Sequence, residues 1–360
     1  MRFRFAFSLV LALLFADVSR ADPPCTENLQ KWLKAEFVKL LDRPKVEFDI
    51  KADPPKKEVD GIVSEHITFA TEKKADGSVE RVPLLLVRPE KNDERRQCVI
   101  VLHGTGGNKE SQRGFMLDLA KRGMIGAAID ARYHGERVPG AKGADAYNEA
   151  ITRAWRTKSG EPMEHPFYYD TCWDLWRTVD YLASRADVDP ERLGMIGFSM
   201  GGIETWLAAS VDSRIKVVVP AISVQSFRWS LEHDEWQGRA RTIKAAHDAA
   251  AADLGEKEVN QQVCRELWSK VIPGILDHYD CPNMLRLFAA DRELLILSGE
   301  KDPNCPLGGA KLAFASAEEA FKEAKREDHL KIMVAPGVGH AVTTEQRNAA
   351  LDWFVKWLTP

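Results

Sequence analysis

The 360-residue sequence predicts an α/β protein with a mostly parallel, twisted central sheet, helices on both faces and lid-like insertions. Three observations support this class. From residue 98 onward, short apolar runs alternate with helical segments, which is the pattern of a parallel sheet covered on both sides. The run CVIVL has no polar position and suits a strand buried on both faces. The composition, 44% hydrophobic and 29% charged, allows a sizeable core.

The elements follow in order. Residues 25–41 have helical periodicity, and ITFAT and VPLLLVRPE are typical of two strands around an ADG turn. Further strands are expected at CVIVLHG, GMIGAAIDA, RLGMIGFS, KVVVPAIS, LLILSGE and HLKIMVAPG. Further helices are expected at 171–185, GIETWLAAS, 308–325 and 343–358.

Two insertions interrupt the alternation, at about 133–170 and about 223–290, and the second contains a helical stretch at 235–254. Long loops after strands of an open α/β sheet usually build the binding site. Both insertions are rich in aromatic side chains, which suit either stacking on a substrate ring or packing of the insertions' own core. These side chains are Trp155, Phe167, Tyr168, Tyr169, Phe227, Trp229 and Trp236.

The N-terminus has the pattern of a signal peptide over residues 1–21. MRFRF carries two arginines, AFSLVLALLFA is an apolar run too short to span a bilayer, and small residues follow at Ser19 and Ala21. A buried helix is disfavoured because the run is not amphipathic. We therefore expect a secreted or periplasmic protein, with residues 22–360 as a single domain and no membrane span after signal removal.

Charge and cysteine usage restrict the partners. The formal charge is −4 and no basic block stands out, so nucleic acid is not an expected partner. The six cysteines form no CxxC and no zinc-ligand spacing, so no metal or other cofactor is expected. Disulfide pairing and burial as reduced thiols both stay open, and the oligomeric state is not readable.

The stretch GMIGFSMGG places Ser199 between Gly197 and Gly201, after a predicted strand and before a predicted helix. Such a tight strand-to-helix turn exposes a serine hydroxyl, and glycine on either side leaves room for the crossing backbone. The helix start behind the serine favours developing negative charge. Ser199 is therefore the expected nucleophile.

A serine hydroxyl needs a base, and the base needs an orienting carboxylate. His340, in the loop APGVGH before the last helix, is the expected base, and Asp302, in GEKDPNCP just past a strand, the expected acid. Asp291 precedes the strand and Glu300 lies too close to its end. The order Ser, Asp, His matches this chemistry on an α/β sheet.

The turn HGTGG follows the strand CVIVL directly. We expect an oxyanion hole from the backbone N–H of Met200 and of Thr105. His103 has no acid partner evident in the sequence and is expected to be structural.

With HGTGG, GFSMGG, GEKDPNCP and GVGH in this order, residues 80–358 resemble the α/β-hydrolase superfamily, in particular dienelactone-hydrolase-like and acetyl-xylan-esterase-like enzymes and the catalytic domain of prolyl oligopeptidases. DARYHGE at 130–136 is similar to the D-x-R-x-x-G stretch of that superfamily. The dienelactone hydrolases proper use a cysteine nucleophile, so their substrate is not carried over, and too few residues precede the strands for the propeller of prolyl oligopeptidases.

The sequence therefore predicts an exported serine hydrolase that cleaves carboxylic esters through an acyl-enzyme, with a small-molecule or carbohydrate ester as substrate. A carbohydrate acetyl ester is the substrate suggested by analogy. Two alternatives stay open: a secreted serine peptidase of prolyl-oligopeptidase type, which uses the same residues, and a non-catalytic binding protein on the same fold.

Overall fold

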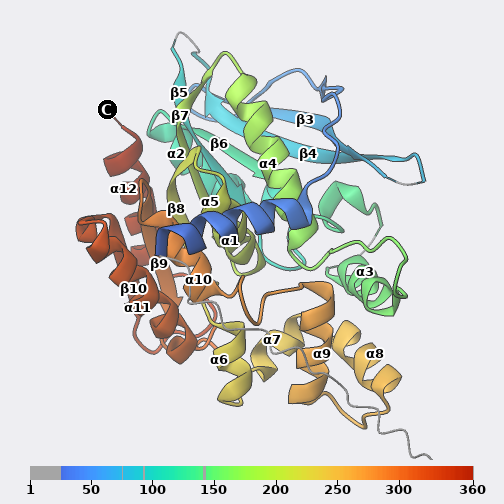
Figure 1. The fold of residues 1–360 in the computed structure, drawn as a ribbon. Helices are drawn as coiled ribbons and strands as arrows, with labels where there is room; N and C mark the ends of the chain where they lie inside the picture. The colour runs from blue at the N-terminus through green and yellow to red at the C-terminus, as the bar shows by residue number, and fades with distance from the viewer. Residues whose placement is uncertain (1–25, 75, 92–93, 141–142, 360) are drawn as a thin grey trace, which may run out of the picture.

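The computed structural model describes residues 26–74, 76–91, 94–140 and 143–359 (Figure 1). The expected signal peptide at 1–21 and Cys25 lie outside the described residues. No helix within the described ranges is long and apolar enough to cross a bilayer.

A ten-stranded sheet forms the centre of the molecule, in the order β1-β3-β4-β6-β5-β7-β8-β9-β10, with β2 paired to β3. The strands from β6 to β10 in this order run parallel; β4 pairs antiparallel with β6, and β3 pairs antiparallel with β4. The strands are β1 (Lys51–Ala52), β2 (Lys56–Lys57), β3 (Ile62–Lys73), β4 (Val79–Pro89), β5 (Arg96–Leu102), β6 (Ile125–Ile129), β7 (Val188–Phe198), β8 (Ile215–Ala221), β9 (Glu293–Gly299) and β10 (Leu330–Ala335). The predicted α/β-hydrolase class and every predicted strand are confirmed.

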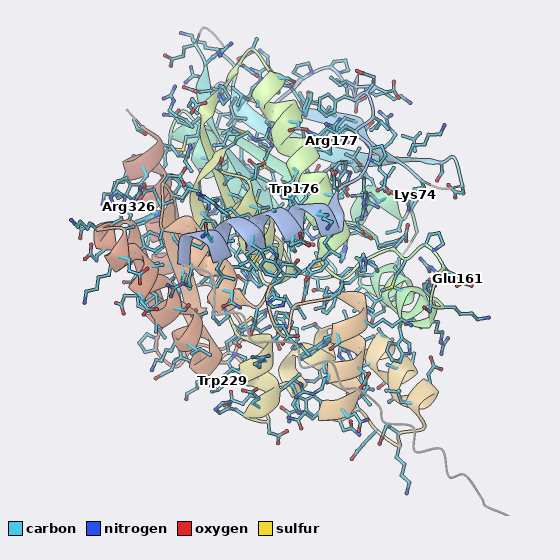
Figure 2. All side chains as sticks on the ribbon, in the orientation of Figure 1. Lys74, Glu161, Trp176, Arg177, Trp229 and Arg326 are labelled. Carbon is cyan, nitrogen blue, oxygen red and sulfur yellow. The ribbon has the colours of Figure 1, made fainter. Side chains whose placement is uncertain are left out.

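Helices cover both faces of this sheet (Figure 1). One face is covered by α2 (Arg113–Lys121) and α12 (Thr344–Leu358), the other by α1 (Thr26–Leu41), α4 (Tyr169–Ser184), α5 (Met200–Val211) and α11 (Leu307–Glu323). Trp176 of α4 lies where α1 crosses this face (Figure 2); its indole meets Phe37 of α1 edge-on and donates to the Ala208 carbonyl of α5. Four short 3-10 segments complete the chain: η1 (Lys109–Gln112), η2 (Gly135–Arg137), η3 (Arg286–Phe288) and η4 (Glu327–His329).

The two insertions pack on each other beside the sheet. The first contains α3 (Asp145–Arg156), and the second contains α6 (Phe227–Glu232), α7 (Gln237–Thr242), α8 (Lys244–Leu254), α9 (Gln261–Val271) and α10 (Cys281–Leu285). Figure 1 shows α3 next to α8 and α9, and these helices are in contact. The helix expected over 235–254 is two helices, because Ile243 leaves the helical region (φ −134°, ψ 51°) and turns its side chain into the core.

Most aromatic side chains of the insertions form their core. Phe167 stacks on Tyr168 with ring centroids 4.0 Å apart, Tyr168 meets Phe227, and Phe227 meets Trp268, and all four are buried. Trp229, labelled in Figure 2, instead stacks on His233 along α6. The packing interpretation therefore holds for these buried rings.

The described cysteines are also part of the buried core. The five cysteines within the described residues, Cys98, Cys172, Cys264, Cys281 and Cys305, are all unpaired and buried. They are buried reduced thiols of the core rather than cross-links, and Cys305 also makes hydrogen bonds.

His247 gives the second insertion a pH-dependent stability. Its ring accepts from the Trp268 indole at 3.0 Å and is fully buried, and this burial lowers its pKa from 6.5 to about 4. The unfolded chain therefore binds one more proton than the folded chain between these values. The free energy of unfolding falls as the pH drops from 6.5 to about 4, by roughly 3 kcal/mol from this group.

We therefore expect the thermal midpoint to decrease as the pH is lowered through this window. The decrease should be less steep in His247→Gln, which keeps an acceptor for Trp268 but has no titrating ring. Calorimetry of both proteins at stepped pH measures the difference. Equal slopes would show that His247 is not the group responsible.

Candidate active site

The turn between β7 and α5 holds Ser199 in a conformation that few non-glycine residues adopt, with φ 56° and ψ −113°. The flanking glycines make this turn sterically possible. A Cβ on Gly197 would lie 2.1 Å from the Gly201 carbonyl oxygen, and one on Gly201 would lie 2.6 Å from the His103 carbonyl oxygen. The glycines predicted from the motif are therefore required by backbone contact on both sides of the serine.

The structure brings the three predicted side chains together. His340 Nε2 lies 2.7 Å from Ser199 Oγ, and His340 Nδ1 lies 2.9 Å and 2.8 Å from the two carboxylate oxygens of Asp302. Ser199 follows β7, Asp302 follows β9 and His340 follows β10, so all three lie at the carboxyl edge of the sheet. This hydrogen-bonded chain is the arrangement in which an imidazole takes the proton of a serine hydroxyl.

Backbone amides fix the orientation of the acid. Asp302 is buried, and its Oδ1 accepts from the amides of Asn304 (2.8 Å) and Cys305 (3.0 Å). The competing acids have other contacts: Glu300 accepts from the Gly337 amide at 2.6 Å, and Asp291 lies before β9 beside Lys216 and Arg292. Of the three acids, Asp302 is the one that contacts His340.

The turn after β5 packs directly against the nucleophile. A Cβ on Gly104 would lie 3.5 Å from Ser199 Cβ, and the Gly201 amide donates to the His103 carbonyl at 3.1 Å. Met200 begins α5 and Thr105 lies in the turn. Among the turn, loop and cap hydrogen bonds of the described residues, neither amide donates to a backbone carbonyl.

The stretch DARYHGE supports this turn. The Ala131 amide donates to His103 Nε2 at 3.1 Å, and His103 Nδ1 lies 2.8 Å from the Gly104 carbonyl oxygen. Asp130 accepts from the Lys109 amide (2.7 Å) and its ammonium (3.0 Å), just beyond the turn. His103 is a hydrogen-bonded bridge in the scaffold, as its lack of an acid partner in the sequence predicted.

Sequence reasoning missed a group of residues behind the acid. Cys305 Sγ lies within 4.8 Å of a carboxylate oxygen of Asp302 and a ring nitrogen of His340. Arg239 of α7 donates to this sulfur at 3.0 Å. Cys305 could have been suspected from its place three residues after Asp302, whereas nothing in the sequence distinguishes Arg239 from the other basic residues of the second insertion.

Asp302, Cys305 and His340 also have the spacing of metal ligands, but their chemistry is unsuited to a cation. Burial raises the pKa of the Cys305 thiol to about 12, which disfavours the thiolate that a metal requires. The Arg239 guanidinium lies beside the same sulfur, and His340 already contacts both Asp302 and Ser199. The arrangement suits proton transfer.

Gly197 offers a test of the elbow. Gly197→Ala has no room for its methyl group, so the backbone of α5 must shift and carry Ser199 with it. We expect kcat to fall roughly 100-fold, the loss typical of a displacement near 1 Å at a reacting group. Gly114→Ala, in α2, meets nothing within 4 Å and should keep wild-type activity. Steady-state ester hydrolysis measures both; an active Gly197→Ala enzyme would contradict the steric argument.

Solved structures share this fold. Acetyl xylan esterase 1 from Thermoanaerobacterium sp. JW/SL YS485 superposes with a TM-score of 0.63 at 16% identity, covering 94% of this chain and 95% of that one. A glucuronoyl esterase from Solibacter usitatus superposes with a TM-score of 0.62 at 16% identity, covering 92% of each chain.

Sequence comparison gives the family. The YtaP protein of Bacillus subtilis (strain 168) is 25% identical over 292 residues, which cover 78% of this chain and 84% of that protein. Residues 35–229, more than half of the chain, match the family described as acetyl xylan esterase (AXE1). This match agrees with the resemblance seen in the motifs and with a serine nucleophile on this sheet. The chain therefore belongs to the acetyl xylan esterase (AXE1) family and is a serine carboxylic-ester hydrolase on the α/β-hydrolase fold.

Proposed function

We propose that Ser199, His340 and Asp302 are the catalytic nucleophile, base and acid of this esterase. Ser199 Oγ attacks the ester carbonyl while His340 Nε2 takes its proton, and the imidazolium then donates that proton to the departing alcohol oxygen. Water attacks the acyl-enzyme with the same base, which releases the carboxylic acid and restores the hydroxyl. Asp302 holds the imidazole and stabilises its charged form.

The observation that carries this proposal is the 2.7 Å contact between His340 Nε2 and Ser199 Oγ, with Asp302 on the opposite ring nitrogen. A non-catalytic binding protein on this fold has no need for all three contacts. The amides of Met200 and Thr105 are proposed as the oxyanion hole, and the loss of one such donor typically raises the barrier by about 3 kcal/mol.

The proposed substrate is an acetyl ester of a carbohydrate. The family description and the named function of a structural neighbour, an acetyl xylan esterase, favour this class.

We also propose that the protein is exported, with residues 1–21 removed and 22–360 as one domain. The support is the charge, apolar run and small residues of the N-terminus. Esters of extracellular plant polysaccharides would meet an enzyme in that location.

Covalent labelling tests the nucleophile. A fluorophosphonate probe should add one phosphonyl group to the protein, at Ser199, with no labelling of Ser199→Ala. The same substitution should lower kcat roughly 10⁶-fold, because the acyl-enzyme cannot form. Intact-mass analysis reads the adduct, and Ser210→Ala, a buried serine on the same helix, is the matched control. An adduct that persists in Ser199→Ala would refute the assignment.

A substrate panel separates the esterase from the peptidase. We expect hydrolysis of 4-nitrophenyl acetate and release of acetate from acetylated xylan oligosaccharides, with no cleavage of proline-containing peptide amides. Acetate release and amine release are followed in parallel at matched enzyme concentration. Peptide cleavage with a kcat/KM above that for the acetylated oligosaccharide would favour the peptidase alternative.

A further inference from the structure

We propose that Arg239, on α7 of the second insertion, is a positioning residue that holds the loop carrying the catalytic acid, an inference that rests on the proposed function of Asp302. The contact that carries it is between the Arg239 guanidinium and the sulfur of Cys305, three residues beyond Asp302. Through this contact the second insertion becomes part of the catalytic apparatus rather than a lid alone.

The burial of Arg239 is the first observation. Its side chain is 1% exposed, and in the described part of the chain its charge interacts with Tyr168, Cys305 and Asp302 without a direct ion pair to a carboxylate. A buried guanidinium without a carboxylate partner is costly. A purely structural core position would be better filled by an apolar side chain, so the charge and the donor geometry of Arg239 call for another explanation.

Arg239 interacts with Tyr168 of the first insertion, and its other hydrogen bonds lead to the acid loop. Nη2 donates to Cys305 Sγ at 3.0 Å, and the thiol in turn donates to the Ile222 carbonyl at 3.2 Å. With its amide oriented to satisfy its neighbours, Gln225 accepts from Arg239 Nε at 3.0 Å and donates to the Asn304 carbonyl at 2.9 Å. The guanidinium therefore reaches two consecutive residues of the loop, one directly and one through Gln225.

The same loop orients Asp302. The amides of Asn304 and Cys305 are the two backbone donors to Asp302 Oδ1. The residues that Arg239 restrains are thus the residues that hold the catalytic carboxylate against His340. Displacement of this loop would move Asp302 away from the imidazole without touching the substrate.

Close packing of α7 reinforces the restraint. A Cβ on Gly238 would lie 1.8 Å from the Pro303 carbonyl oxygen, so the helix backbone rests directly on the loop. Phe227 packs beneath the guanidinium, with its ring centroid 5.9 Å from Arg239 Cζ. The planar guanidinium can contact the Phe227 ring, the Cys305 thiol and the Gln225 amide at once. A lysine ammonium would place its N–H donors at a single atom.

Arg239→Met keeps the volume and removes the hydrogen bonds to Cys305 and Gln225. We expect kcat for 4-nitrophenyl acetate to fall roughly 10- to 100-fold with KM unchanged, because Asp302 and not the substrate site is disturbed. The rate of fluorophosphonate inactivation should fall by the same factor. The kcat of Arg239→Lys should lie between that of the wild type and that of Arg239→Met. Arg241→Met, exposed on the same helix, is the matched control and should equal wild type.

A double-mutant cycle with Cys305→Ala tests whether the contact itself is responsible. If Arg239 acts through Cys305, the double variant should lose little more kcat than the single variants. Should Arg239→Met not fold, Arg239→Lys and Cys305→Ala carry the same test. A KM increase at constant kcat, or unchanged kcat in the folded variants, would overturn the inference. Absence of probe labelling in the wild type would instead refute the proposed function.

Discussion

The backbone crossing at Ser199 is the constraint on which the rest of the structure depends. Strand β7, helix α5 and the turn after β5 meet within van der Waals contact, and the serine between them has a left-handed φ of 56°. Such strain persists only where the surroundings over-determine it. Here they do: the Ser199 amide donates to Ala221 and the Gly201 amide to His103, so the neighbouring strands on both sides hold the turn in place.

From this crossing the positions of the other proposed catalytic groups follow by topology. Parallel strands β5, β7, β9 and β10 end at one edge, and each contributes a short loop there. The loops approach so closely that a Cβ on Gly299 would lie 2.1 Å from the Gly339 carbonyl oxygen. His340 thereby makes direct hydrogen bonds to Asp302 and Ser199, which lie 38 and 141 residues away in the sequence.

The sequence predicted what is locally encoded. Ser199 and His340 lie in glycine-rich loops and Asp302 in the loop EKDPNCP, each directly after an apolar strand, so their local sequence predicted their proposed roles. Arg239, Gln225 and Cys305 have no such pattern, because their function arises from contacts between α7 and the acid loop that no window of sequence contains. The helices α2, α3, α6, α9 and α10 were not predicted either, because they are short and depend on packing of their apolar sides against elements distant in the sequence.

His103, a second histidine near Ser199, is kept in its neutral form by burial. His103 accepts from the Ala131 amide through Nε2, so Nδ1 must carry the proton that it donates to the Gly104 carbonyl, and the ring is neutral. Burial lowers the pKa of His103, which maintains this neutral form. The turn after β5 is thus braced by an uncharged ring, whereas His340, the proposed base, is the histidine that contacts a carboxylate, that of Asp302.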